Sequence, residues 1–360
     1  MSFFYQPRYN IEISLSVFEN RIISITIKMK LLLVFTVCVA STWAFLPDEV
    51  VYGEWIKFLE KYEKSYRSNV QFYKRQMVFR KNLEHFYEHN KLFDEGKVTY
   101  TKGVNKFSDL TPEEFNIYVQ EGLLKYEDEH FDGGEYTGDE STIPLESVDW
   151  REKGAVSHVR DEGICAPCYA ISAAEAIEGQ LKIAKGISAN LSVQNFVDCT
   201  REQGNLGCSG GLVTNCYDYV KKYGIETELD YPPVGHETFD CRFDRSKSVA
   251  QLKTYMKVTN GSEEALQKAI ANIGPISVGM DFTVNLMGYK SGIFDDESCD
   301  SNKILHTALA IGYGTENGID YYIVKNVFGS DWGEQGYFRI VRNKNNRCGI
   351  ATMATFPILV

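Results

Sequence analysis

The chain has few basic residues for its size and no apolar run long enough to cross a membrane. Of its 360 residues, 38 are Lys or Arg and 49 are Asp or Glu, so the formal net charge at pH 7 is −11. Nucleic-acid-binding proteins present a basic face. The apolar run from Leu31 to Ala40 is shorter than the about 20 residues of a spanning helix. The composition therefore argues against nucleic-acid partners and against a membrane span.

The cysteine content and the N-terminal region point to the secretory pathway. Nine cysteines are many for a cytosolic protein, in which thiols stay reduced. A basic stretch at 28–30 precedes the apolar run, and small residues end it, as in a secretory signal peptide. We expect residues 29–44 to be that signal and residues 1–28 to be a spurious extension. A signal anchor is the alternative interpretation. Removal of the signal would leave a lysosomal or extracellular protein.

Two cysteines three positions apart mark the most informative stretch of the chain. Cys165 and Cys168 are followed by apolar residues at helical spacing, and Gly186 comes next as a stop signal. Cys168 is thus expected at a helix N-terminus, where a thiol is biased toward the thiolate that attacks carbonyl carbon. From these residues alone three interpretations stay open: a nucleophile beside a structural cysteine, a redox pair, or half of a zinc site.

The region before residue 115 carries two further patterns. An aromatic stripe predicts a packed helix, and a second helix follows with its own spaced residues. A short motif then precedes Thr111-Pro112, a helix start with proline at its first position. The stripe is Trp55, Phe58, Tyr62 and Tyr66; the long motif is Arg75, Phe79, Asn82, Phe86 and Asn90; the short motif is Gly103, Asn105, Phe107 and Asp109.

These two motifs resemble those of the inhibitory propeptide of papain-like, cathepsin L-type cysteine proteases. The long motif has Gln71 at its first, usually acidic position, and Phe86 replaces the usual isoleucine. The resemblance implies an inhibitory prodomain over 50–115, followed by a prosegment tail and acidic linker over 116–142. Seven acids between 127 and 140 resist burial and favour cleavage there. We therefore expect maturation to leave a chain that begins near residue 143.

The rest of the chain resembles the mature papain-like enzymes over its full length. The resemblance implies an α+β, two-domain papain-like fold, with a helical left domain over 143–255, a β-rich right domain over 256–360, and the cleft between them. Cys168 matches the nucleophile of that family. His306, 138 residues later, matches the base, and Asn326 matches the residue that orients the histidine. These roles are those of a thiolate–imidazolium pair held by an amide.

The resemblance also assigns the cysteines. It implies disulfides Cys165–Cys208, Cys199–Cys241 and Cys299–Cys348, and the redox interpretation falls because Cys165 has another partner. Cys38 falls in the signal, and Cys216 is interpreted as a small buried apolar residue without an assigned partner. No metal and no cofactor is expected.

The resemblance further implies the substrate site and the partners. Glycines 210 and 211 would let an extended peptide pair with the backbone. Small and apolar residues match the pocket for the substrate residue two positions before the cut, which predicts a hydrophobic residue there. Expected partners are protein substrates, the chain's own propeptide and cystatin-type inhibitors, and we expect a monomer. Asn190 and Asn260 begin glycosylation sequons. The substrate-binding residues are Gly210, Gly211, Leu212, Val213, Gly279, Leu305, Met353 and Trp332.

Several residues depart from the family pattern around the nucleophile. Glu162 stands where the family has the oxyanion glutamine; an ionised carboxylate repels the oxyanion, while a protonated one donates to it and favours acid pH. Ala166 and Pro167 stand where the family has glycine and serine, and Tyr169 stands where it has tryptophan. Val327-Phe328 replaces a serine–tryptophan pair. Two functions therefore stay open: a cysteine endopeptidase made as a zymogen and slowed by Glu162, or a weak or inactive homologue that acts by binding or regulation.

The resemblance also makes a prediction about activation. The prodomain is expected to run through the cleft against the substrate direction. Acid would weaken its carboxylate contacts, above all those of Asp109, and so loosen it.

Overall fold

The computed structural model describes residues 46–120, 133–138 and 145–360. The expected signal peptide and the extension before it lie outside these residues, as does most of the acidic linker. Residues 51–360 group into one unit by their contacts. No helix in the described ranges is long and apolar enough to cross a membrane.

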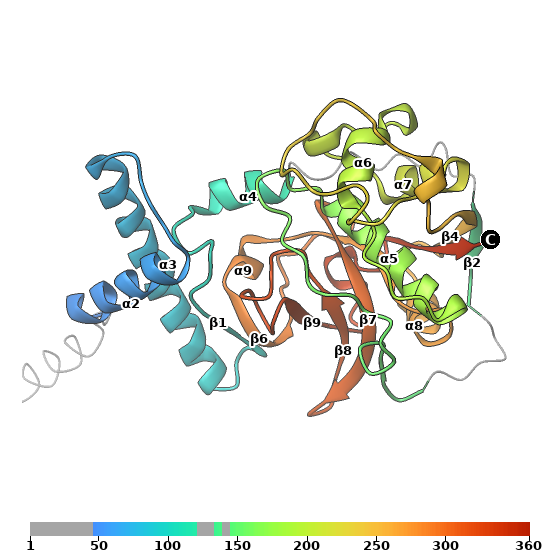
Figure 1. The fold of residues 1–360 in the computed structure, drawn as a ribbon. Coiled ribbons are helices and arrows are strands. Elements are labelled where there is room, and N and C mark those ends of the chain that lie inside the picture. Colours follow the sequence, from blue (N-terminus) through green and yellow to red (C-terminus); the bar gives the residue numbers. More distant parts are fainter. Residues whose placement is uncertain (1–45, 121–132, 139–144) are drawn as a thin grey trace, which may run out of the picture. The chain divides into compact units, whose positions relative to one another are not determined.

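Three helices make up the prodomain: α2 (Asp48–Lys61), α3 (Asn69–Asp94) and α4 (Pro112–Gln120) (Figure 1). The α3 helix begins after Ser68, whose hydroxyl accepts from the Gln71 N–H at 3.2 Å. The Gln71 side chain in turn accepts from the Arg67 N–H at 2.9 Å, so a glutamine serves at the motif position where the family has an acid.

Trp55 and Phe58 of the aromatic stripe form the core between α2 and α3, whereas Tyr62 and Tyr66 lie beyond the end of α2 and are half-buried. Trp55, Phe58 and Phe79 are all buried. The ring centroid of Phe79 lies 5.2 Å from that of Trp55 and 4.9 Å from that of Phe58. Buried aromatic pairs at these distances add dispersion and quadrupole attraction to the area that they bury. This core fixes the angle between α2 and α3 and thereby the place of the motif residues along α3.

A ten-stranded sheet links the prosegment to the rest of the chain. Its order is β1-β6-β9-β8-β7-β5-β10-β4-β2, with β3 paired to β7 outside this path. The two end strands, β1 and β2, both come from the part of the chain before residue 145. The strands are β1 (Tyr100–Lys102), β2 (Gly134–Tyr136), β3 (Val148–Asp149), β4 (Leu252–Val258), β5 (Ile276–Met280), β6 (Tyr289–Phe294), β7 (His306–Glu316), β8 (Ile319–Lys325), β9 (Tyr337–Val341) and β10 (Met353–Leu359).

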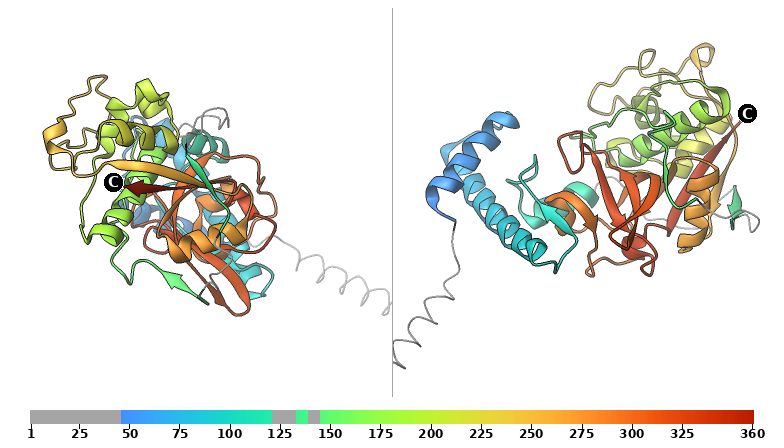
Figure 2. Two further views of the ribbon diagram at one scale, coloured as in Figure 1. Left: turned by 90° about the vertical axis from the view of Figure 1, so that its right-hand side faces the viewer. Right: turned by 90° about the horizontal axis from the view of Figure 1, so that it is seen from below.

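Of the helices after residue 145, α5, α6 and α7 lie on one side of strands β7 and β8, whereas α9 lies on the other side, beside β6 (Figures 1 and 2). The α5 helix ends at Gly186, whose φ of 71° is left-handed and whose N–H bonds the Leu181 and Lys182 carbonyls, so the predicted stop is confirmed. Short 3₁₀ turns lie at 201–203, 207–209, 245–247 and 347–349. The helices are α5 (Cys168–Lys185), α6 (Val193–Cys199), α7 (Val213–Lys222), α8 (Glu263–Asn272) and α9 (Val284–Met287).

The fold is α+β, as expected, and its buried apolar residues fall into two clusters. One cluster joins α8, the sheet and the prosegment, and the other joins α5, α6 and α7. Strand β4 crosses the expected domain boundary at 255 and pairs with β10. The structure contains the three disulfides that the resemblance implied, Cys165–Cys208, Cys199–Cys241 and Cys299–Cys348.

Candidate active site

Cys168 is the first residue of α5, and the loop before it is held in place from two sides. The Cys165–Cys208 disulfide anchors one side, and the Glu162 N–H donates to the Val327 carbonyl at 2.8 Å on the other. Ala166 takes a left-handed φ of 49°, a conformation that glycine adopts at less cost. In this state the Cys168 N–H donates to the Ala166 carbonyl at 3.0 Å.

His306 and Asn326 meet because of how their strands pair. His306 opens β7, and Asn326 directly follows β8, the antiparallel neighbour of β7. The His306 Nε2 donates to the Asn326 Oδ1 at 3.1 Å, which fixes the tautomer and leaves Nδ1 for another partner. The His306 ring packs against both Phe282 and Phe328, with centroid distances of 4.3 Å and 5.2 Å.

The structure brings three chemically active groups together at the start of α5. One carboxylate oxygen of Glu162, the Cys168 Sγ and one ring nitrogen of His306 all lie within 4.8 Å of one another. Their exposed fractions are 5%, 0% and 1%. The predicted catalytic residues Cys168, His306 and Asn326 thus converge, and Glu162 joins them.

Burial dominates the electrostatics of this group. It raises the pKa of the Cys168 thiol, and the neighbouring Glu162 carboxylate raises it further. Burial lowers the pKa of His306 to about 4, with the Asn326 hydrogen bond acting in the opposite sense. Burial also raises the pKa of Glu162 to about 8, helped by Asp161 and opposed by prosegment groups. With the prosegment in place, all three groups therefore favour their uncharged forms at pH 7.

The prosegment supplies the cover that buries this group. The Phe107 ring packs edge-on against Phe328 at 4.9 Å between centroids, and the Tyr118 ring lies 5.9 Å from the Phe328 ring. The Tyr118 hydroxyl donates to the Gly163 carbonyl at 3.2 Å. Lys106 donates to both carboxylate oxygens of Asp161 at 2.7 Å. Phe328, smaller than the family's tryptophan, is thus covered by prosegment aromatics.

Side chains of the long motif hold the short motif in its shape. Asn82 donates to the Ser108 and Leu110 carbonyls, each at 2.9 Å, and Arg75 donates to the Asp109 carbonyl at 2.8 Å. The Asp109 carboxylate, which is buried, accepts from Lys64 and Tyr66, each at 2.9 Å. Those five contacts all lie inside the prosegment, so Asp109 acts on the shape of the inhibitory segment.

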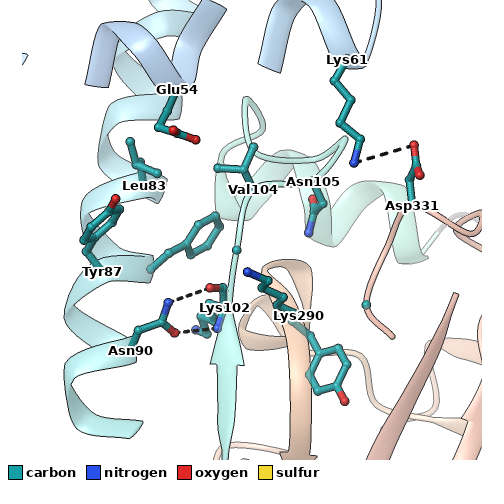
Figure 3. Close-up of a pocket in the computed structure, with 14 residues that line it drawn as sticks. Glu54, Lys61, Leu83, Tyr87, Asn90, Lys102, Val104, Asn105, Lys290 and Asp331 are labelled. Atoms are coloured by element: carbon teal, nitrogen blue, oxygen red, sulfur yellow. Dashed lines mark hydrogen bonds and ion pairs between the residues drawn. The ribbon is translucent and has the colours of Figure 1, made fainter. Parts of the chain in front are cut away.

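The prosegment docks on the strand that follows α9. Strand β1 pairs antiparallel with β6, and the Gly103 N–H donates to the Gly288 carbonyl at 2.8 Å. The side chain of Asn90 in α3 makes two hydrogen bonds to the backbone of Lys102. It accepts from the Lys102 N–H and donates to the Lys102 carbonyl, both at 2.8 Å (Figure 3). The same view shows Lys61 reaching toward Asp331 at 4.0 Å.

A buried histidine lies behind this docking strand. The His89 Nε2 donates to the Tyr100 carbonyl at 2.9 Å, and the two rings lie 4.4 Å apart. Burial lowers the pKa of His89 to about 4, and Lys102 and His85 add to that effect. Because the folded state binds fewer protons than the unfolded state below pH 6.5, stability falls as the pH drops from about 6.5 to about 4.

We expect the stability of His89→Gln to fall less than that of the wild type when the pH is lowered. Glutamine keeps an N–H donor for the Tyr100 carbonyl but takes up no proton. The measurement is the free energy of unfolding by denaturant at pH 7 and pH 5, in a Cys168→Ala background that prevents self-cleavage. His236→Gln is the matched control, since His236 is exposed. If the free energy of unfolding fell as much between pH 7 and pH 5 in His89→Gln as in the control, His89 would not have this role.

The predicted substrate residues fall into two places. Gly279 of β5 pairs with Met353 of β10, and a Cβ at 279 would lie 2.6 Å from the Met353 Cε. Leu305 donates its N–H to the Met280 carbonyl directly before His306. The structure therefore places Gly279, Leu305 and Met353 on neighbouring segments next to His306.

The other predicted substrate residues lie at the start of α7 and near Phe328. Leu212 and Val213 open α7, and Gly210 has a left-handed φ of 111°. A Cβ at Gly211 would lie 2.6 Å from the Asn205 Oδ1, so that position requires glycine. Trp332 is buried, with its ring edge-on to Phe328 at 5.4 Å.

Sequence reasoning missed three residues of this site. Ile304 lies 2.7 Å from a Cβ built on Gly279, and its position next to Leu305 was the available signal. Phe282 packs on His306, and Tyr118 lies over the loop of Glu162. Both come from segments far from the cysteine and histidine in sequence, with no local pattern that marks them.

Comparisons with known proteins match both parts of the chain. The papain family cysteine protease model matches residues 144–358, and the cathepsin propeptide inhibitor domain (I29) model matches residues 55–115. The chain is 39% identical over 305 residues to a cathepsin L-like proteinase of Fasciola hepatica, covering 85% of this chain and 93% of that protein. It is 41% identical over 307 residues to a cathepsin L-like proteinase of Phaedon cochleariae, with the same two coverages, 85% and 93%.

Solved structures agree with these matches. The digestive procathepsin L 3 of Tenebrio molitor larval midgut superposes with a TM-score of 0.81 at 40% identity, covering 86% of this chain and 99% of that one. The digestive procathepsin L2 of the same animal gives a TM-score of 0.82 at 38% identity, covering 86% and 100%. The chain is therefore a cathepsin L-like member of the papain family of cysteine proteases, a hydrolase made with its propeptide inhibitor domain.

Proposed function

We propose that the chain is a cysteine endopeptidase in which Cys168 is the nucleophile, His306 the base and Asn326 the orienting group. The observation that carries this is the placement of a His306 ring nitrogen within 4.8 Å of the Cys168 Sγ, together with the bond from the His306 Nε2 to Asn326 at 3.1 Å. His306 takes the thiol proton, and the thiolate adds to the scissile carbonyl. The imidazolium then protonates the leaving amine, and water hydrolyses the acyl-enzyme.

Removal of the prosegment switches this pair from its neutral to its charged form. The cover from Phe107 and Tyr118 leaves with it, and water enters the cleft. The desolvation that raises the pKa of Cys168 and lowers that of His306 then weakens, so the thiolate–imidazolium pair becomes accessible. The intact zymogen is held inactive by its electrostatics as well as by the physical block.

Glu162 makes the rate depend on pH. A protonated carboxyl at this position donates to the oxyanion of the tetrahedral intermediate, whereas the carboxylate repels it. Burial favours the protonated form in the zymogen, and acid pH favours it in the matured enzyme. The second donor, the Cys168 N–H, is bonded to the Ala166 carbonyl in the zymogen and must turn toward the substrate. These features favour a protease that works at mildly acidic pH.

The substrate preference follows from the apolar residues beside His306. Gly279, Leu305 and Met353 carry no charge. Leu212 and Val213, at the start of α7, are also apolar. Gly210 and Gly211 leave their backbone accessible for pairing with an extended peptide. We propose a hydrophobic residue two positions before the scissile bond.

The same proposal covers the processing and location of the chain. The signal peptide directs it to the secretory pathway, with the lysosome or the extracellular space as destination. Removal of the prodomain (50–115) and of the tail and linker (116–142) leaves the domains 143–255 and 256–360. The matured enzyme acts as a monomer and binds cystatin-type inhibitors. The alternative is a weak or inactive homologue that binds peptides, which Glu162 and the bonded Cys168 N–H favour.

Hydrolysis of a fluorogenic peptide with a hydrophobic residue before the cleaved one tests the proposal. The chain is processed at acid pH and assayed from mildly acidic to neutral pH. We expect wild type and Cys216→Ala, which removes the other buried thiol, to be active, and Cys168→Ala to lose at least about 10³-fold in kcat. A wild type no faster than Cys168→Ala would favour the binding homologue.

A further inference from the structure

We propose that Glu162, Cys168 and His306 form an inhibitory Zn²⁺ site in the matured enzyme. The proposal goes beyond peptide hydrolysis, because metal binding at these three side chains does not require turnover. The site would exist because a carboxylate stands where the family has an amide. It adds a negatively charged oxygen ligand to a thiol and an imidazole.

The geometry of the three groups is close to that of a zinc site. Their ligand atoms lie within 4.8 Å of one another. Zinc binds sulfur at about 2.3 Å and nitrogen or oxygen at about 2.0–2.2 Å in a tetrahedron, which puts neighbouring ligand atoms roughly 3.3–3.8 Å apart. Small side-chain rotations close this difference. The three groups come from the loop before α5, from the start of α5 and from the start of β7, so they approach a common point from different elements.

Glu162 points to a missing ligand. In the zymogen its side chain is 95% buried, given an exposed fraction of 5%, and neither of its oxygens makes a hydrogen bond of normal geometry within the described residues. The nearby Tyr118 hydroxyl, which lowers the pKa of Glu162, belongs to the prosegment and leaves on maturation. Buried oxygens of this kind are nearly always bonded, since leaving one without a partner costs free energy. A divalent cation would satisfy one of them and pull the carboxylate toward Cys168 and His306.

The charge balance and the surrounding contacts also suit zinc. A thiolate and a carboxylate together neutralise the two positive charges of Zn²⁺. The metal replaces the Cys168 thiol proton and any proton on Glu162, and both leave to solvent. The Asn326 Oδ1 accepts from the His306 Nε2, the outer-sphere contact that orients a metal-binding imidazole through its other nitrogen.

Metal binding at this site would be restricted to the matured enzyme and would block it. Phe107 and Tyr118 of the prosegment close the approach to Phe328 and the Glu162 loop in the zymogen. Once the metal holds the Cys168 sulfur, that sulfur cannot attack a carbonyl carbon. Zn²⁺ would therefore inhibit reversibly, and a chelator would restore activity.

The test is a titration of matured protein with Cd²⁺, which reports thiolate binding by charge-transfer absorption, followed by displacement with Zn²⁺. We expect one Cd²⁺ per chain, and an affinity at least about 10-fold weaker in Glu162→Gln. Absorption that is lost in Cys168→Ala but kept in Cys216→Ala would place the metal at the proposed thiol. Circular dichroism of each variant checks that it is folded.

Two results would overturn the proposal. Equal Cd²⁺ affinity in wild type and Glu162→Gln would show that the carboxylate does not bind the metal and that only the thiol and the imidazole do. Absorption that disappears in Cys216→Ala and persists in Cys168→Ala would place the metal elsewhere. Neither readout uses peptide hydrolysis. The test therefore distinguishes an inactive enzyme with an intact metal site from an active enzyme without one.

Discussion

Replacing Glu162 with glutamine raises kcat/KM of the matured enzyme at pH 7 by about 10²–10³-fold, the effect of restoring one oxyanion donor. The carboxyl donates only while it is protonated, whereas an amide donates at every pH. Steady-state hydrolysis of the fluorogenic peptide by both proteins measures the change. The increase should lie in kcat, because the oxyanion forms only in the transition state.

The pH profile separates this explanation from a general improvement in folding. Burial raises the pKa of Glu162 to about 8 in the zymogen. Loss of the prosegment removes part of that burial, so in the matured enzyme we expect the pKa to move below 7 toward the about 4.3 of a free glutamate, and the carboxyl to be ionised at neutral pH. The wild type should therefore lose activity as the pH rises through this window, while Glu162→Gln does not. The gain from the substitution is then smallest in acid and largest at neutral pH.

An exposed glutamate offers the matched control. Glu152→Gln makes the same change of carboxylate to amide at an exposed side chain. We expect its kcat/KM to stay within about 3-fold of the wild type. An equal gain in Glu152→Gln, or no gain at any pH in Glu162→Gln, would show that Glu162 does not limit the oxyanion step.

Asp109→Asn should release the prosegment at higher pH and speed activation at neutral pH by about 10–100-fold. The buried Asp109 carboxylate accepts from Lys64 and Tyr66, and a hydrogen bond to a charged group contributes about 1.5–3 kcal/mol. Asparagine removes that charge and with it the ion pair to Lys64. The rate of processing from pH 7 to pH 4, followed by gel and by activity, measures the effect, and the variant should show the flatter dependence.

Asp94→Asn serves as the control for this prediction. Asp94 ends α3 and is exposed, so the same chemical change there should leave processing as in the wild type. If Asp109→Asn processed at the wild-type rate across this range, the short motif would not depend on the charge of Asp109. The acid trigger would then belong to other groups, with His89 the first to test.

The local elements of the fold could be predicted from the sequence because their signals are local. The aromatic stripe with Trp55 identified the α2–α3 core, and Gly186 marked the end of α5. The convergence of Cys168, His306 and Asn326 could not be predicted from spacing, because it depends on how β7 and β8 pair. Only the family resemblance supplied it.

The contacts that cover the site could not be predicted at all. Phe328 stands where the family has the larger tryptophan, and in the zymogen the rings of Phe107 and Tyr118 pack against it. Their contacts depend on the register in which the prosegment lies on the mature part. The same holds for the Ala166 carbonyl, which bonds the Cys168 N–H because Ala166 takes a left-handed conformation. No residue pattern encodes that choice.

Reaction of the chain with a thiol-directed epoxide at mildly acidic pH, mapped by mass spectrometry, tests the central claim most directly. The account predicts that the processed protein is labelled at Cys168 and not at Cys216. It also predicts that the intact zymogen reacts far more slowly, because the prosegment buries Cys168 and keeps it uncharged. A processed protein whose Cys168 stays unlabelled, or reacts no faster than in the zymogen, would contradict the claim that Cys168 and His306 form an active pair.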